Sequence, residues 1–94
     1  MRSIEYKKSF DRTYRKLETK DQLKVDEAIE EVLSALEDRQ IPKGLGLKRL
    51  QDDQWEIRVD LSLRVGFRMS KNLIEFSIVG DHDFIKKFLK STSL

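Results

Sequence analysis

The spacing of apolar residues changes from a helical period to a strand period near the middle of the chain, and this change constrains the fold more than any other feature. Over residues 21–38 apolar side chains recur every three or four positions, which is typical of one face of a helix. Over residues 55–69 apolar and polar side chains alternate, which is typical of half-buried strands. Pro42, Gly44 and Gly46 separate the two patterns. Because proline lacks a backbone donor and glycine tolerates a positive φ, we expect the helix to end and the chain to turn there.

Two helices are expected in the first half of the chain, after a short strand. Residues 2–6 alternate in part and predict that strand. Ser9 can act as the N-cap of a helix that begins at Phe10. The second helix follows over residues 21–38 after a short link, so we expect the two helices to form an antiparallel hairpin. The expected apolar stripe of the first helix is Phe10, Tyr14 and Leu17.

The second half is expected to form strands joined by short turns, and then a terminal helix. Residues 55–61 and 63–69 predict two strands of a hairpin, with their apolar side chains facing inward. Residues 73–79 are nearly all apolar, which favours a central strand. A further short strand over residues 45–50 is an open alternative. Residues 82–90 predict a short helix, whose expected inward side chains are Ile85, Phe88 and Leu89.

The resulting order, β-α-α-β-β-β-α, predicts an α+β fold. Helices that precede a run of strands favour two N-terminal helices packed on one face of a mostly antiparallel, twisted sheet of about four strands, with a short C-terminal helix. The other face of the sheet is expected to be open to solvent or to a partner. At 94 residues, we expect the whole chain, 1–94, to form a single domain.

The composition excludes several classes of chemistry. Cysteine is absent, which excludes disulfide scaffolds, thiolate nucleophiles and zinc ribbons. There is one histidine, so a second histidine cannot support a nucleophile or a metal site. No apolar run is long enough for a signal peptide or for the roughly 18 residues of a membrane span. We therefore expect a cytoplasmic protein with no membrane partner, no metal and no cofactor.

Charge is unevenly distributed along the chain, although the net charge is only +2. Residues 1–17 and 43–68 are basic, whereas residues 19–39 are acidic. Basic segments on both sides of an acidic helix favour a surface that approaches phosphate from one side, as in a nucleic-acid-binding protein. Ordinary solvation of a mixed surface is the alternative interpretation.

Four side chains are candidates for catalysis. Strand alternation places Glu56 and Arg58 on one face of the first hairpin strand, and it places Arg64 on the same face of the next. His82 follows a strand and a glycine, so it can reach the edge of that face. Four further cations could widen the basic field and bind RNA; they are Lys48, Arg49, Arg68 and Lys86.

This set suits the cleavage of RNA by its own 2′-hydroxyl. That reaction needs a base, cations that stabilise the pentacoordinate phosphate, and an acid that protonates the leaving 5′ oxygen. Glu56 could be the base, Arg58 and Arg64 the stabilising cations, and His82 the acid, because histidine titrates near neutral pH. The alternative is that these residues are the cross-strand charge pairs of any solvent-facing antiparallel strand.

The order of motifs resembles the toxins of the RelE/ParE superfamily, and in particular the RelE/YafQ-like toxins of type II toxin–antitoxin systems. The resemblance is carried by residues 44–69, GLGLKRLQDDQWEIRVDLSLRVGFRM, and by residues 73–90, LIEFSIVGDHDFIKKFLK. In both this chain and the family, a Leu-Lys-x-Leu segment leads to a strand pair with an arginine in the second strand. A hydrophobic strand then ends in Gly-x-His or Gly-x-Arg.

The resemblance implies a toxin that cleaves messenger RNA on the ribosome and so inhibits translation. Arg64 matches the arginine that contacts the scissile phosphate, His82 falls near the reaction centre, and Arg58 matches a basic position. The sequence departs from the pattern at Glu56, where RelE has a lysine. It also departs at the terminal aromatic position, where only Phe84 or Phe88 is available and neither can donate a proton.

The resemblance also implies partners. These are a cognate antitoxin protein, the ribosome and messenger RNA, with a small toxin–antitoxin hetero-oligomer as the assembly. Two other functions stay open at this point. One is a ParE-like inhibitor of DNA gyrase, and the other is a non-catalytic member of the fold that only binds a partner.

Overall fold

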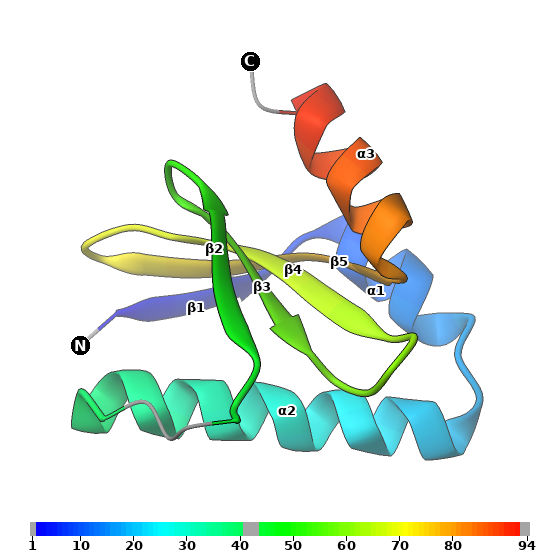
Figure 1. Ribbon diagram of the computed structural model, residues 1–94, viewed down its shortest axis with the longest axis horizontal. Helices are drawn as coiled ribbons and strands as arrows, with labels where there is room; N and C mark the ends of the chain where they lie inside the picture. The colour runs from blue at the N-terminus through cyan, green and yellow to red at the C-terminus, as the bar shows by residue number, and fades with distance from the viewer. Residues whose placement is uncertain (1, 41–43, 93–94) are drawn as a thin grey trace.

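The computed structural model describes residues 2–40 and 44–92, with the backbone alone at residues 89, 91 and 92. Three helices and five strands follow one another along this part of the chain (Figure 1). In chain order the elements are β1 (Ser3–Tyr6), α1 (Lys8–Arg15), α2 (Thr19–Asp38), β2 (Leu47–Gln51), β3 (Gln54–Arg58), β4 (Arg64–Met69), β5 (Leu73–Gly80) and α3 (His82–Thr92).

The strands form one sheet in the order β1-β5-β4-β3-β2. β1 runs parallel to β5, and the other neighbours are antiparallel. The expected α+β fold with a mostly antiparallel sheet is therefore confirmed. The sheet has five strands instead of about four, because the optional strand over residues 45–50 forms as β2.

The main core lies between the sheet and the two N-terminal helices, as expected. The apolar face of α2 buries Val25, Ile29 and Val32 against the inward side chains of β3, β4 and β5. Phe10 of α1 is buried in the same core, and Tyr14 and Leu17 pack against it. The stripe predicted for the first helix is therefore confirmed for Phe10 and Tyr14, whereas Leu17 packs against the core from the link after α1.

The expected antiparallel helix hairpin is wrong. α1 packs mainly on β5, whereas α2 crosses beneath β3 (Figure 1). The helices meet near their connection, where the Tyr14 hydroxyl donates to Asp26 at 2.8 Å and the Gln22 amide donates to the Tyr14 carbonyl at 3.1 Å. Each helix is held by the sheet more than by the other helix.

The ends of the helices differ in part from the prediction. α1 begins at Lys8, and Ser9 is not its N-cap. α2 ends at Asp38 and is capped by Arg39, which adopts a left-handed φ of 57° and donates its N–H to the Ala35 carbonyl. Gly44 and Gly46 have the expected positive φ, at 86° and 81°. Pro42 lies outside the described residues.

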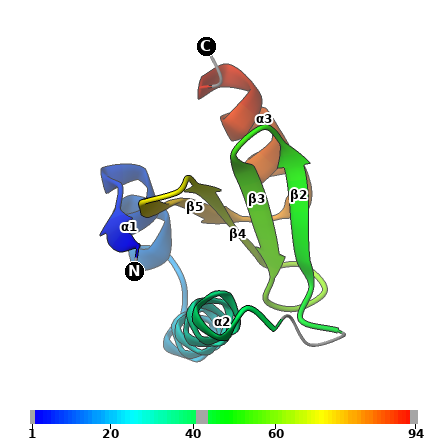
Figure 2. The ribbon, with the colours of Figure 1, turned by 90° about the vertical axis from the view of Figure 1, so that its left-hand side faces the viewer.

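The second face of the sheet was expected to be open to solvent or to a partner. It is only partly open, because α3 covers part of it. Ile85 of α3 is completely buried and packs with Ile78, Leu50 and Phe88 in a second, smaller core. Figure 2 looks along α2 and shows α3 on the other side of the sheet. The side chain of Leu89, which was expected to face inward, is not among the described side chains. In the part of the chain that the structure describes, no helix is long and apolar enough to cross a membrane.

The connection between β3 and β4 is a five-residue turn, residues 59–63. Asp60 organises it by accepting the backbone N–H of Ser62 at 2.9 Å and that of Leu63 at 2.8 Å. Leu61, which was expected to face inward, is 93% exposed at the tip of this turn. The strand alternation is broken there because the chain has already left the sheet.

Candidate functional site

Strand register gathers the predicted charges on the face of the sheet that carries α3. Glu56 lies opposite Gly66 on one side and opposite Lys48 on the other, and Arg58 lies opposite Arg64. Directly opposite residues project to the same face of a sheet. Four of the predicted side chains are therefore brought together by backbone pairing alone.

Glu56 is the centre of this group, although it was expected on an open surface. Its side chain is only 1% exposed, and it binds two partners. Oε2 accepts a hydrogen bond from Nη1 of Arg64 at 3.1 Å, and Oε1 lies 3.1 Å from Nδ1 of His82. A charge buried to this degree is stable only when it is paired and hydrogen-bonded. We refer to Glu56, Arg64 and His82 as the triad.

The triad restricts the hydrogen bonds that Arg64 and His82 can make with another molecule. An ionised carboxylate only accepts hydrogen bonds, so the ring form with a proton on Nδ1 is the one that can donate to Glu56. Nε2 is then the ring nitrogen left for another molecule. The His82 side chain is 37% exposed and that of Arg64 is 19% exposed. Within the described residues, Nε of Arg64 is buried without a hydrogen-bond partner. Both groups are thus held firmly but keep hydrogen-bonding capacity.

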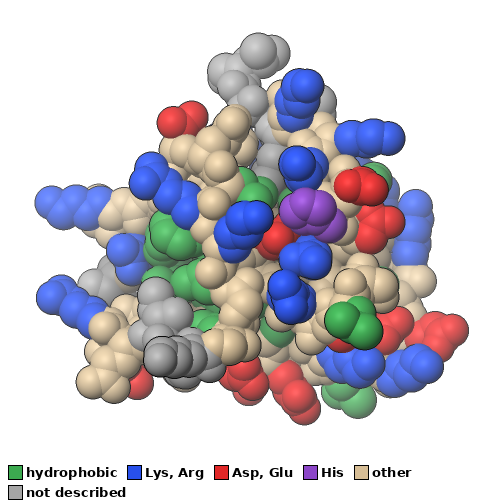
Figure 3. All heavy atoms as spheres, viewed as in Figure 1, with side chains coloured by type: hydrophobic (Ala, Val, Ile, Leu, Met, Phe, Trp, Pro, Cys, Tyr) green, Lys and Arg blue, Asp and Glu red, His purple; other side chains and the backbone are tan. Residues whose placement is uncertain are grey.

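Further cations lie beside the triad. Arg58 is directly opposite Arg64, and like charges in this arrangement repel each other, although the Glu56 carboxylate bound to Arg64 offsets part of the repulsion. Gly46 allows the chain to approach Arg58 closely, since a Cβ atom at Gly46 would lie 3.0 Å from the Cβ of Arg58. Lys86 lies one helical turn after His82 on α3, on the same side of the helix. Figure 3 shows the single histidine with lysine and arginine side chains above it, below it and on its left, and with acidic side chains on its right.

Two predicted RNA-binding residues are not beside the triad. Arg68 is on the same face but four residues along β4 from Arg64, roughly 13 Å at the rise of a strand. Arg49 lies opposite Trp55, on the other face of the sheet, and its Nε donates to the Asp52 carbonyl at 2.7 Å. Of the four cations proposed to bind RNA, only Lys48 and Lys86 adjoin the triad.

The burial of Glu56 could not be read from strand alternation, which placed it with the solvent-facing charges. The sequence did contain one indication of this burial. Ile85 and Phe88 of α3 are apolar, so the helix has to pack against an apolar surface. Leu50 and Ile78 supply that surface on the same face as Glu56. A terminal helix packed on Leu50 and Ile78 also covers the side chains beside them, and Glu56 is one of these.

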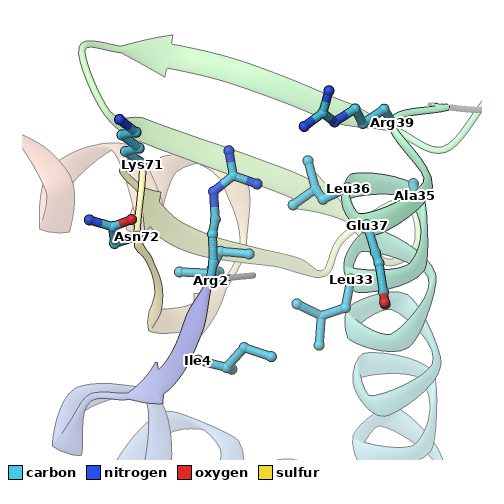
Figure 4. Close-up of a pocket in the computed structure, with 10 residues that line it drawn as sticks. Arg2, Ile4, Leu33, Ala35, Leu36, Glu37, Arg39, Lys71 and Asn72 are labelled. Atoms are coloured by element: carbon cyan, nitrogen blue, oxygen red, sulfur yellow. The ribbon is translucent and has the colours of Figure 1, made fainter.

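A separate groove lies between β1 and the C-terminal half of α2 (Figure 4). It has a volume of about 970 Å³ and shares no residue with the triad. Its apolar lining includes Ile4, Leu33 and Leu36, and its charged lining is Arg2, Glu37, Arg39 and Lys71. The groove is therefore apolar inside, with more cations than acids at its rim.

Comparison with known proteins gives structural matches alone. No model of a protein family matches the sequence, and no curated protein is significantly similar to it. A chain of the RelB–RelE antitoxin–toxin complex of Methanococcus jannaschii matches with a TM-score of 0.66 and 15% identity, over 89% of this chain and 96% of that chain. A chain of the DinJ–YafQ complex of E. coli matches with a TM-score of 0.65 and 17% identity, over 90% and 98%.

A third match is the YoeB dimer of Staphylococcus aureus, with a TM-score of 0.65 and 16% identity over 86% of this chain and 97% of that chain. The three matches cover nearly the whole of both chains. At such low identities they show the fold alone, which is the RelE-like toxin fold that the sequence resembled. Two of these neighbours, the DinJ–YafQ and RelB–RelE complexes, are toxin–antitoxin complexes.

Proposed function

We propose that this chain is the toxin of a toxin–antitoxin pair and that it cleaves messenger RNA on the ribosome, so that translation stops. The observation that carries the proposal is the meeting of Arg64 and His82 at one buried carboxylate, with Arg58 opposite Arg64. A phosphodiester would relieve the repulsion between the two arginines and would lie near a histidine. The fold shared with solved toxins supports the same function.

The proposed reaction is attack of the 2′-hydroxyl on the adjacent phosphorus, while the hydroxyl proton passes to a solvent water. The new bond forms a 2′,3′-cyclic phosphate, and the bond to the 5′ oxygen breaks to release a 5′-hydroxyl. Arg64 and Arg58 bind the phosphate oxygens and stabilise the negative charge of the transition state. With a proton on both ring nitrogens, His82 donates the proton that the leaving 5′ oxygen needs, through the Nε2 atom that Glu56 leaves unbound.

Glu56 has a different role in this proposal from the one that the sequence suggested. A catalytic base has to reach the 2′-hydroxyl, but the Glu56 side chain is 1% exposed and both of its oxygens have partners. We therefore assign it as a positioning residue that orients the Arg64 guanidinium and the His82 ring.

The test is cleavage of messenger RNA on purified ribosomes, mapped by primer extension with the ends of the products identified chemically. The proposal predicts cleavage that depends on the ribosome, with 2′,3′-cyclic phosphate ends. Products with a 5′-phosphate would contradict 2′-hydroxyl attack. Inhibition of gyrase supercoiling without RNA cleavage would instead support the ParE-like alternative.

The groove beside β1 supports the antitoxin as a partner in the same proposal. Ile4 is 46% exposed there, and the rim holds three cations against one acid. These features suit a segment of the antitoxin with apolar and acidic side chains.

The groove can be tested with the product of the adjoining reading frame as the binding partner. Ile4→Glu should weaken that complex by at least about 10-fold, whereas Leu23→Glu should not. Leu23 is a suitable control because it is 57% exposed and does not line the groove. Equal affinity of the two variants would exclude this groove.

A further inference from the structure

The pairing of β4 with β5 contains one extra residue. Gly66 lies opposite Ile78, but the next residue, Phe67, lies opposite Phe76. Ser77 is therefore left without a partner in β4, which is a β-bulge. A bulge changes the phase of the strand that follows it, because each residue added reverses the face to which later side chains point.

The bulge decides which face the end of β5 presents to α3. Before it, Ile74 and Phe76 point into the main core; after it, Val79 points there and Ile78 packs with α3. Without the extra residue, Ile78 would share the face of Phe76 and the chain would leave the sheet with the opposite orientation. His82, two residues after the end of β5, would then not be directed toward Glu56.

Two hydroxyl groups of α1 bind the backbone of β5 at this bulge. The Ser9 hydroxyl donates to the Ser77 carbonyl at 2.5 Å, and the Thr13 hydroxyl accepts the backbone N–H of Val79 at 3.0 Å. The Thr13 hydroxyl in turn donates to the Ser9 carbonyl at 2.8 Å. Ser9 and Thr13 are one helical turn apart, so they face the strand together.

These hydroxyls supply the hydrogen bonds that a neighbouring strand would otherwise make to the end of β5. β1 is the neighbour of β5 as far as Tyr6, and the Lys7 N–H makes a further bond to the Phe76 carbonyl. The chain then turns into α1, so β1 cannot pair with residues 77–79. Buried backbone groups need partners, and here side chains supply them.

We propose that Ser9 and Thr13 are positioning residues for His82 that act from the far side of the sheet. They hold the bulge, and the bulge sets the orientation in which β5 delivers His82 to Glu56. The catalytic part of this inference rests on the proposed function. The structural part does not, because it concerns the position of the imidazole ring.

The first test is a nuclear magnetic resonance spectrum of the imidazole nitrogens. The chain has one histidine, so the signals belong to His82 without further assignment. Thr13→Val keeps the shape of the side chain but removes the hydroxyl, and we expect it to shift the His82 signals in the folded protein. Thr13→Ser restores the hydroxyl and should restore the signals. Thr19→Val, at the start of α2, is the matched control and should leave them unchanged.

The second test is the cleavage assay on ribosomes. Thr13→Val should lower kcat by about 10-fold with little change in KM, because it misplaces a catalytic group rather than removing a substrate contact. If Thr13→Val does not fold, Ser9→Ala removes the other hydroxyl and is measured in the same two ways.

The outcomes separate this inference from the proposed function. Unchanged His82 signals in a folded variant without the hydroxyl would overturn the inference, since a merely stabilising contact lowers the melting temperature alone. Shifted signals that Thr13→Ser restores would support it even if the wild-type chain cleaves no RNA. In that case the proposed function fails and the positioning role stands.

Discussion

Glu56 is an unusual residue for the middle of a strand, because its carboxylate is almost wholly buried between the side chains of Arg64 and His82. Removing a charge from water is costly, and the cost is offset only when partners satisfy the charge. The triad therefore stabilises the fold only when all three of its side chains are present. It also gives the Arg64 and His82 side chains a shared hydrogen-bond partner.

The first prediction concerns the charge of Glu56. Glu56→Gln leaves Arg64 without its counter-ion, so we expect the free energy of unfolding to fall by about 3 kcal/mol. Urea denaturation measures this change. Glu5→Gln is the control, because Glu5 is exposed on β1 and its substitution should cost little. A loss for Glu56→Gln no larger than that of the control would contradict the buried triad.

The second prediction concerns Asp60 and pH. The hydrogen bond from the Ser62 N–H, helped by Leu63 and Lys24, lowers the pKa of Asp60 although desolvation opposes it. Since the folded pKa is depressed, the stability that Asp60 contributes is present above its unfolded pKa and is lost as pH falls through the folded value. Asp60→Ala should cost about 1 kcal/mol at neutral pH and progressively less in acid.

Urea denaturation across this pH range measures the difference between wild type and Asp60→Ala. Asp60→Asn is the control, because it keeps an acceptor for the turn but carries no charge. It should retain much of the stability at neutral pH and show no titration at this position. A wild-type advantage that stays constant as the pH falls would show that the Asp60 charge does not stabilise the turn.

At the scale of elements, the position of α3 decides whether the triad forms. α3 begins at His82, and Asp81 caps it by accepting the Phe84 N–H at 2.8 Å. Gly80 lets the chain turn closely, since a Cβ atom there would come within 2.3 Å of the Phe84 ring. A short helix fixed at its first turn places its first residue accurately.

The third prediction follows from that cap. Asp81→Ala should destabilise the protein by about 1 kcal/mol and lower RNA cleavage, because the first turn of α3 loosens around His82. Asp83→Ala, in the same turn and also exposed, should change both measurements much less. Thermal denaturation and the ribosome assay together distinguish the two variants. Full cleavage by folded Asp81→Ala would show that the cap does not position His82.

The elements themselves could be predicted from the sequence because apolar periodicity is a local property. Their faces could not always be predicted, because a face depends on what packs against it. Glu56 alternates like a surface residue but is covered by α3, and Leu61 alternates like a core residue but lies on a turn. The bulge at Ser77 could not be predicted, because residues 73–79 are nearly all apolar and their pattern does not show which side chains point to which face. Ser9 looked like a helix cap because a hydroxyl before a helix suits either role.

At the scale of the whole molecule, the charges separate by face. The acidic helix α2 lies on one side of the sheet, and the triad with Lys48, Arg58 and Lys86 lies on the other (Figures 2 and 3). An RNA bound as we propose would therefore approach the triad from the side of the sheet opposite α2. The groove at β1 is away from this surface, so a partner could bind there while the triad is occupied.

The most direct test of the account is the rate of messenger RNA cleavage on ribosomes by Arg64→Ala. Arg64 is proposed to stabilise the transition state, and loss of one such donor usually lowers the rate by at least about 100-fold. Arg49→Ala is the matched control, because it removes an arginine from the opposite face of the same sheet. We predict that Arg49→Ala cleaves at nearly the wild-type rate. Equal rates for the two variants would contradict the claim that the triad is a catalytic site.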